Sequence, residues 1–172
     1  MEAETILQYF ADYGSIAVFV IVLLEYLNLP GFPAGIIMPL AGFCAAQGNL
    51  SFLGTMTVSV AAGLTGSIIL YWLGRAGGGL FLEKYYRRFP KQREKIEEKI
   101  DYLRRKGGIG VFVSKLLPMV RTLISIPAGV IKMNFGKYVI SSVCGVAVWN
   151  LFFVGAGYFF GESILTMLGG AV

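Results

Sequence analysis

Residues 26 to 74 contain no aspartate, glutamate, lysine or arginine. A soluble domain of 172 residues has too small an interior to hide an uncharged run of that length. The hydrocarbon core of a bilayer, in contrast, requires about 20 apolar residues for each helix that crosses it. Hydrophobic residues make up 56% of the chain, which fits the same environment. The sequence therefore predicts an all-α integral membrane protein.

Two segments are apolar and long enough to cross a bilayer as helices, Phe52 to Gly74 and Tyr138 to Gly161. A third, Gly14 to Leu29, contains Glu25 and needs part of the preceding segment to reach across. We expect it to form an N-terminal transmembrane helix. The chain starts with acidic residues where the first part of a secretory signal is basic, so we expect no cleaved leader.

The charge is concentrated in one segment, residues 75 to 107. Eleven of the fifteen basic residues and five of the ten acidic ones lie between Arg75 and Lys106. Basic loops stay on the cytoplasmic side of a membrane. The span before this segment should therefore run inward, and the span that starts at Tyr138 should run outward.

The same segment predicts an amphipathic helix on the inner membrane surface. Apolar residues recur at helical spacing between Pro90, which can open a helix, and Gly107-Gly108, which can close one. Basic residues within 84–106 could each contribute about 1 kcal/mol to binding an anionic lipid surface. The alternative is a solvated loop without a partner. We expect no nucleic-acid binding from so short a segment.

Two further stretches, residues 29 to 48 and residues 110 to 132, are apolar but interrupted by proline. Broken backbone at membrane depth is tolerated only where protein buries it or where it lines a wet cavity. We therefore expect each stretch to form a re-entrant helical hairpin. The residues that should shape the two hairpins are Pro30, Pro33, Gly35, Pro39, Pro118, Pro127 and Gly129.

The two halves of the chain resemble each other. Pro30 and Pro39 match Pro118 and Pro127 at an offset of 88 residues, and three residues around the spans match at an offset of 83: Phe52, Gly74 and Gly78 with Phe135, Gly157 and Gly161. Because the two spans run in opposite directions, this predicts an inverted repeat of hairpin plus transmembrane helix, as in many transporters. The alternative is a chance or merely structural repetition of proline and glycine.

Arg121 lies inside the second hairpin, where an arginine costs roughly 3 kcal/mol or more. A residue that is so costly at membrane depth needs a partner or a purpose. Our interpretation is that Arg121 binds the phosphate of a lipid headgroup, together with Lys115, Thr122 and Ser125. For Ser114 and Ser125 an alternative is hydrogen bonding to the interrupted backbone.

Glu25 is the remaining acidic residue at membrane depth. In one interpretation it is a structural counter-ion for Arg121. In the other, a lipid phosphate displaces Glu25 from Arg121, and protonation of the carboxylate eases that exchange. Glu25 would then gate transport.

A family resemblance rests on a string of residues in the second hairpin: Pro118, Arg121-Thr122, Ser125, Pro127-Ala128-Gly129, Met133 and Phe135. This string closely resembles the signature of DedA membrane proteins, the bacterial group related to eukaryotic VTT-domain scramblases. The likeness extends over nearly the whole chain, from Glu25 to Gly161. It implies one domain over residues 1–172, with two opposed hairpins, in a multi-pass protein of the bacterial cytoplasmic membrane.

The resemblance also implies a function, the movement of undecaprenyl phosphate or phosphatidylethanolamine between leaflets, often with dependence on the proton gradient. Two residues depart from the family's pattern. Gly35 stands where an acidic residue is common, which leaves proton coupling open and favours a phospholipid as the substrate. Lys115 stands where an arginine is common, and it offers phosphate a point charge without the bidentate fork of a guanidinium.

Two other functions compete with lipid transport. A small-ion or proton transporter with secondary effects on lipids would need only Glu25 and Arg121. An enzyme acting on lipid phosphates is disfavoured, because the chain has no histidine and no aspartate cluster for a metal. We therefore expect no enzymatic activity, no metal and no cofactor. Cys44 and Cys144 are expected to be packing residues and not a disulfide.

Two features allow more than one interpretation, the G-x-x-x-G pairs and Asn150. The G-x-x-x-G pairs Gly74 to Gly78 and Gly157 to Gly161 mark either a close approach of helices or the point where each helix stops. Asn150, inside a span, either joins two helices or contacts lipid. A homodimer that seals the hairpins is a further expectation for so small a chain.

Overall fold

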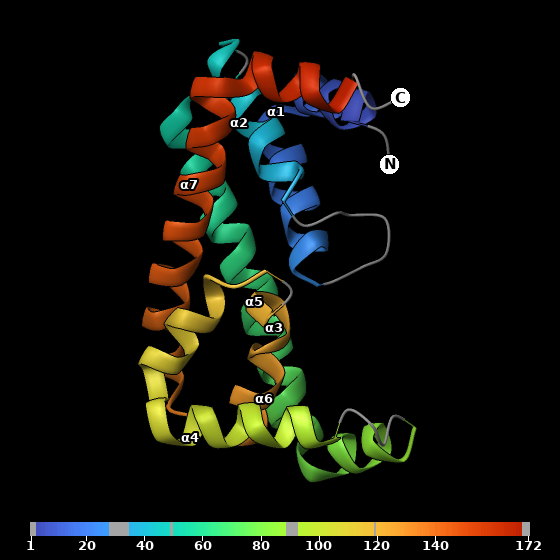
Figure 1. Ribbon diagram of the computed structural model, residues 1–172, viewed down its shortest axis with the longest axis vertical. Helices are drawn as coiled ribbons and strands as arrows, with labels where there is room; N and C mark the ends of the chain where they lie inside the picture. Colours follow the sequence, from blue (N-terminus) through green and yellow to red (C-terminus); the bar gives the residue numbers. More distant parts are fainter. Residues whose placement is uncertain (1–2, 28–34, 49, 89–92, 119, 170–172) are drawn as a thin grey trace. The chain divides into compact units, whose positions relative to one another are not determined.

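The computed structural model describes residues 3–27, 35–48, 50–88, 93–118 and 120–169 (Figure 1). Every secondary-structure element in these residues is a helix, which confirms the all-α prediction. The helices are α1 (Ala3–Tyr26), α2 (Ile37–Ala46), α3 (Phe52–Arg88), α4 (Arg93–Lys115), α5 (Val120–Leu123), α6 (Ser125–Val130) and α7 (Phe135–Gly169).

Helices α3 and α7 contain the two stretches long and apolar enough to cross a membrane, Phe52–Gly78 and Phe135–Gly161. Both predicted spans are found, and each is somewhat longer than predicted. The second begins at Phe135 because the side chain of Asn134 accepts a hydrogen bond from the backbone N–H of Lys137 at 3.1 Å, which caps the helix. The third predicted span corresponds only in part to a shorter apolar helix, Tyr13–Tyr26.

Four helices bend where the backbone leaves helical dihedral angles. Three of the bends lie at glycines with positive φ, Gly14 at 54°, Gly78 at 47° and Gly107 at 53°. Glycine adopts this region without a steric penalty, so the chain can change direction and resume a helix at once. The fourth bend lies at Phe160 in α7. In α3 and α7 the bend marks the end of the apolar stretch.

The charged segment differs from its prediction in where the amphipathic helix ends. The sequence predicts an end at Gly107-Gly108, but α4 bends at Gly107 and continues to Lys115 (Figure 1). The first part of α4 is amphipathic, since Leu103 is buried while Arg104 and Arg105 are exposed. The start of this helix was predicted at Pro90, which lies outside the described residues.

The chain divides into two compact units, and the division falls within α3 and α7. Unit 1 comprises Met1–Gly63 and Ala147–Val172, and unit 2 comprises Leu64–Val146. In unit 1, α1 and α2 pack against each other (Figure 1). The start of α3 and the end of α7 are joined by a hydrogen bond that the Asn150 side-chain amide donates to Ser59 Oγ at 3.1 Å. Asn150 therefore links two helices, one of its two interpretations.

Paired glycine contacts hold α2 of unit 1 against α7. Gly42 of α2 lies against the carbonyl of Val154, and Gly157 of α7 lies against the carbonyl of Pro39. A Cβ at either glycine would collide with the facing backbone. Small residues at such crossings let two helices approach until their backbones touch, which is a common way to hold helices together in lipid.

Unit 2 contains the same kind of contact between α6 and α3. Gly129 of α6 lies against the carbonyl of Tyr71, and Gly74 of α3 lies against the carbonyl of Ile126. The pattern is the same in both units. Each helix contributes one glycine and one backbone carbonyl to the contact, and the glycine comes three residues after the carbonyl in the chain. Gly74 and Gly157 thus mark close approaches, as one of the two interpretations of the G-x-x-x-G pattern predicts. The other interpretation, that the helix stops there, is wrong for α3, which bends at Gly78 and continues to Arg88.

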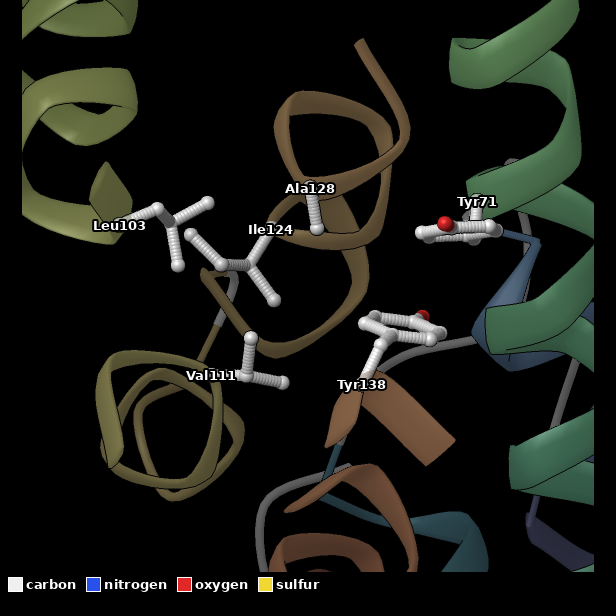
Figure 2. Close-up of a cluster of buried hydrophobic side chains, with 6 residues drawn as sticks. All are labelled: Tyr71, Leu103, Val111, Ile124, Ala128 and Tyr138. Atoms are coloured by element: carbon white, nitrogen blue, oxygen red, sulfur yellow. The ribbon is translucent and has the colours of Figure 1, made fainter. Parts of the chain in front are cut away.

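The core of unit 2 forms around Ile124, between α5 and α6. Figure 2 shows Leu103, from before the bend in α4, and Val111, from after it, both pointing toward Ile124. The bend at Gly107 therefore lets one helix contact the hairpin from two directions. On the other side of the hairpin the rings of Tyr71 and Tyr138 stack with their centroids 4.5 Å apart.

The two predicted hairpins are described in part. Pro30 and Pro33 lie outside the described residues, Gly35 has a φ of 103°, and Pro118 lies in the turn before α5. Pro39 and Pro127 both occupy the third position of their helices, α2 and α6, where a backbone N–H has no partner within the helix. The re-entrant course of the hairpins and the inverted relation of the two halves remain predictions.

Candidate functional site

A lysine is buried in unit 2 at the end of α4. Lys115 is 1% exposed, and its ammonium donates hydrogen bonds to Ser67 Oγ of α3 at 2.7 Å and to Ser125 Oγ of α6 at 3.1 Å. Gly145 of α7 faces the stem of this side chain so closely that a Cβ there would collide with it. Four helices therefore position one positive charge.

Arg121 lies six residues further along, on the short helix α5. Its side chain is the largest of those that are fully buried, at 0% exposure, and its neighbour Thr122 is buried as well. The guanidinium of Arg121 is close enough to Lys115 to interact with its charge. Two like charges near each other repel, and an anion bound between them would interact favourably with both.

Hydroxyl groups surround the lysine. The side chains of Ser67, Ser125, Tyr138 and Ser142 are all buried, and Tyr138 donates its hydroxyl proton to the carbonyl of Ser67 at 2.8 Å. A serine hydroxyl has two acceptor lone pairs and one proton. Ser67 and Ser125 both accept a hydrogen bond from Lys115, which places two hydroxyl groups at the ammonium.

The four residues predicted to bind a phosphate all lie in unit 2 and are all buried: Lys115, Arg121, Thr122 and Ser125. The structure joins Lys115 to Ser125 directly. The alternative for Ser125, that its hydroxyl serves the interrupted backbone, remains a prediction. Glu25 is buried in unit 1, and its predicted pairing with Arg121 remains a prediction because the two residues belong to different units.

Sequence reasoning missed two residues of this site, Ser67 and Tyr138. Ser67 is one of several serines and threonines in an apolar span, and Tyr138 stands near the start of another, where tyrosine is common. Neither position carries a local signal. They become significant only when folding brings them to Lys115 and to each other.

The site offers no sign of metal chemistry. Among the residues that the structure describes, no group of three or more histidines, cysteines, aspartates or glutamates is placed to hold a metal ion. Both cysteines are free thiols, as predicted. Cys44 is buried and packs as predicted, whereas Cys144 is exposed, so the prediction that it is a packing residue is wrong.

Comparisons with known proteins identify the family to which the chain belongs. A family model described as the VTT domain matches residues 32–159. Undecaprenyl phosphate transporter A of Bacillus subtilis (strain 168) is 32% identical to the chain over 131 residues, which cover 76% of the chain and 66% of that relative. The protein of the same name from Staphylococcus aureus (strain NCTC 8325 / PS 47) is 30% identical over 151 residues, covering 86% and 74%.

A third relative, Protein DedA of Escherichia coli (strain K12), is 27% identical over 135 residues, which cover 77% of the chain and 61% of that protein. No solved structure matches the chain at a significant level. The VTT model covers well over half of the chain, and it includes Lys115, Arg121 and both hairpin helices that make the glycine contacts. The chain therefore belongs to the VTT-domain family, the DedA membrane proteins.

Proposed function

We propose that this protein moves a phosphate-bearing lipid between the leaflets of the bacterial cytoplasmic membrane. The observation that carries the proposal is the burial of Lys115 and Arg121 near each other in unit 2. Arginine and lysine at membrane depth mark substrate or ion pathways far more often than they serve packing. A phosphate is the anion that suits a guanidinium and an ammonium together.

The hydroxyls around Lys115 support the same ligand. A phosphate presents several acceptor oxygens, and the serine hydroxyls beside Lys115, those of Ser67 and Ser125, are groups that can donate to such oxygens. Lys115 would then supply a charge and Arg121 a pair of parallel N–H donors. Thr122, buried beside Arg121, is the fourth member of the proposed site.

The names of two relatives fit this chemistry, since both are undecaprenyl phosphate transporters. Undecaprenyl phosphate and phosphatidylethanolamine both carry a phosphate next to long hydrocarbon chains. The proposed site engages what they share. The lipid would enter from the membrane with its phosphate at the cations, and Glu25 would gate release by competing with the phosphate for Arg121.

The paired glycine contacts support a two-part transport device. Each unit holds one hairpin helix against one long helix by the same reciprocal contact of glycine with a backbone carbonyl. This likeness supports the proposed inverted repeat, in which each hairpin and its span would move together. The exposed basic residues of α4, such as Arg104 and Arg105, would hold the cytoplasmic side to anionic lipid.

The test is leaflet-to-leaflet movement of fluorescent phosphatidylethanolamine and of undecaprenyl phosphate in proteoliposomes. We expect Arg121→Ala to lose transport, and Arg121→Lys to retain folding but to transport at least about tenfold more slowly, because lysine lacks the bidentate fork. Lys137→Ala is the control, since this lysine is exposed and lies outside both the proposed phosphate site and the basic segment 84–106.

Each outcome has a clear meaning. Full-rate transport by Arg121→Lys would rule out recognition of phosphate by the guanidinium. If folded native protein moved neither lipid but passed protons or small ions, the competing ion-transport function would replace the proposal.

A further inference from the structure

A groove in unit 2 has no role in the proposed phosphate site. Its volume is about 370 Å³, within the range of pockets that bind small molecules. The first part of α4 contributes Glu98 and Tyr102 to its wall, and the part after the bend contributes Val113 and Ser114. The rest of the wall comes from the turn and from the hairpin: Leu117, Val120 and Ile124.

One charged side chain lines this otherwise largely apolar groove. Two other acidic residues of the same helix pair with arginine: Glu97 contacts Arg93 at 2.8 Å, and Asp101 contacts Arg104 at 3.7 Å. Among the described residues Glu98 is in neither ion pair and lines the groove instead. A carboxylate at the mouth of an apolar groove selects for a positively charged partner.

Each buried cation directly follows a residue of the groove wall in the chain. Ser114 precedes Lys115, and Val120 precedes Arg121, so each cation is the chain neighbour of a residue that lines the groove. The groove therefore has a carboxylate and apolar surface in its wall, and two positively charged residues one position away from that wall in the chain. An occupant that complements all three features carries an ammonium, a phosphate and a hydrocarbon chain.

We propose that this groove binds the headgroup of a phospholipid that carries a primary amine, with the ammonium at Glu98 and the hydrocarbon along Val113, Leu117 and Val120. This inference rests on the proposed function, because it takes the phosphate to lie at Lys115 and Arg121. A primary ammonium has three protons to donate, one to Glu98 and others to acceptors such as the Tyr102 hydroxyl. A polyprenyl phosphate offers Glu98 no cation. Glu98 is thus the residue that selects between the two lipid classes.

The first test removes the charge and keeps the shape. Proteoliposomes would be assayed with fluorescent phosphatidylethanolamine and with fluorescent phosphatidylglycerol, which has the same phosphodiester but no amine. We expect Glu98→Gln to lower the ratio of the two transport rates about tenfold by slowing the amine lipid alone. Glu94→Gln, an exposed carboxylate on the same helix outside the groove, should leave the ratio unchanged. Equal effects of Glu98→Gln on both lipids, or none on either, would overturn the proposal.

A second measurement detects occupancy without transport. A photoreactive amino acid at Leu117, which is 48% exposed in the groove wall, would be activated in vesicles of phosphatidylethanolamine and phosphatidylglycerol, and the captured lipid identified by mass spectrometry. We expect capture of the amine lipid, its loss in Glu98→Gln, and no preference at Ile109, which is 70% exposed and lies outside the groove.

The two measurements separate the two proposals. Preferential capture of the amine lipid at Leu117 without any transport would support the groove and reject the lipid transport function. Transport that depends on Arg121, with no preference for the amine lipid at Leu117 or in the rates, would support the transport function and reject the groove.

Discussion

Gly157 of α7 lies directly against the backbone carbonyl of Pro39 in α2, with no room for a side chain between them. The contact is returned three residues along each helix, where Gly42 faces the carbonyl of Val154. The proline and the glycines of this region, visible in the sequence as helix breakers, are therefore the residues that let two helices touch.

Replacing Gly157 with alanine should destabilise unit 1. The added Cβ would collide with backbone, which cannot rotate away, and overpacking of this kind costs about 1–3 kcal/mol. Gly155→Ala is the control, because nothing lies within 4 Å of a Cβ there and alanine favours a helix by up to about 1 kcal/mol. In detergent, the midpoint of thermal unfolding should be lower for Gly157→Ala than for the native protein. For Gly155→Ala it should be equal or higher. The reverse order would contradict the close approach.

Unit 2 should respond in the same way at Gly74. A Cβ added at Gly74 would collide with the carbonyl of Ile126. A Cβ added at Gly54 of the same helix would make an ordinary contact of 3.5 Å with Ser51. We expect Gly74→Ala to lower the free energy of unfolding by about 1–3 kcal/mol, and Gly54→Ala to leave it unchanged. Thermal unfolding, or chemical unfolding monitored by tryptophan fluorescence, would measure the stability of both variants. If the two variants had the same unfolding midpoint, the proposed backbone contact between α6 and α3 would be contradicted.

Lys132 lies just after the end of α6 and has a left-handed backbone conformation, which glycine adopts more easily than lysine. Its φ is 52°, and the following N–H, of Met133, donates to the carbonyl of Ala128 at 3.1 Å, which is a Schellman cap. Gly48 holds the corresponding position after α2. Lys132→Gly should stabilise the protein by about 1 kcal/mol, because a side chain is strained at this φ. Lys137→Gly, which removes the same charge from within a helix, should destabilise it. A thermal midpoint that falls for Lys132→Gly would contradict this account.

Lys115 and Ser67 should be energetically coupled. Removing the serine hydroxyl leaves the buried ammonium short of an acceptor, at a cost of about 1.5–3 kcal/mol, and the same change costs much less once Lys115 is methionine. A double-mutant cycle of Ser67→Ala and Lys115→Met measures this difference. The exposed pair Arg93 and Glu97 is the control, with an expected coupling of about 0.5 kcal/mol or less. Additive effects at Lys115 and Ser67 would mean that the hydrogen bond contributes nothing.

Tyr138→Phe should destabilise unit 2 by about 1 kcal/mol. The change removes a buried hydroxyl that donates to the carbonyl of Ser67 at 2.8 Å, and it keeps the ring stacked on Tyr71. Tyr158→Phe is the control, because this ring packs edge-on against Phe52 at 5.1 Å and is partly exposed. Chemical unfolding of both variants would check the difference, and equal midpoints would contradict a role for the Tyr138 hydroxyl.

Several features of this protein could be predicted from local sequence because they depend on composition over one helix. The two long spans follow from the absence of charge in hydrocarbon. Lys115 and Arg121 stood out for the same reason, since a cation in an apolar stretch is costly wherever the helix ends up.

Other features depended on which helix faces meet, and no local pattern contains that information. The sequence predicted an end to the helix at Gly107, but packing of Leu103 and Val111 on Ile124 from two sides makes it a bend. Ser67 reaches Lys115 across 48 residues of chain, and Glu98 reaches the groove only because α4 folds back on the hairpin. The sequence by itself thus determined the membrane environment, the buried cations and the places where helices can break. Only the tertiary structure decided the hydroxyls around Lys115, the carbonyl that each glycine touches and the wall of the groove, because these arise from contacts between residues far apart in the chain.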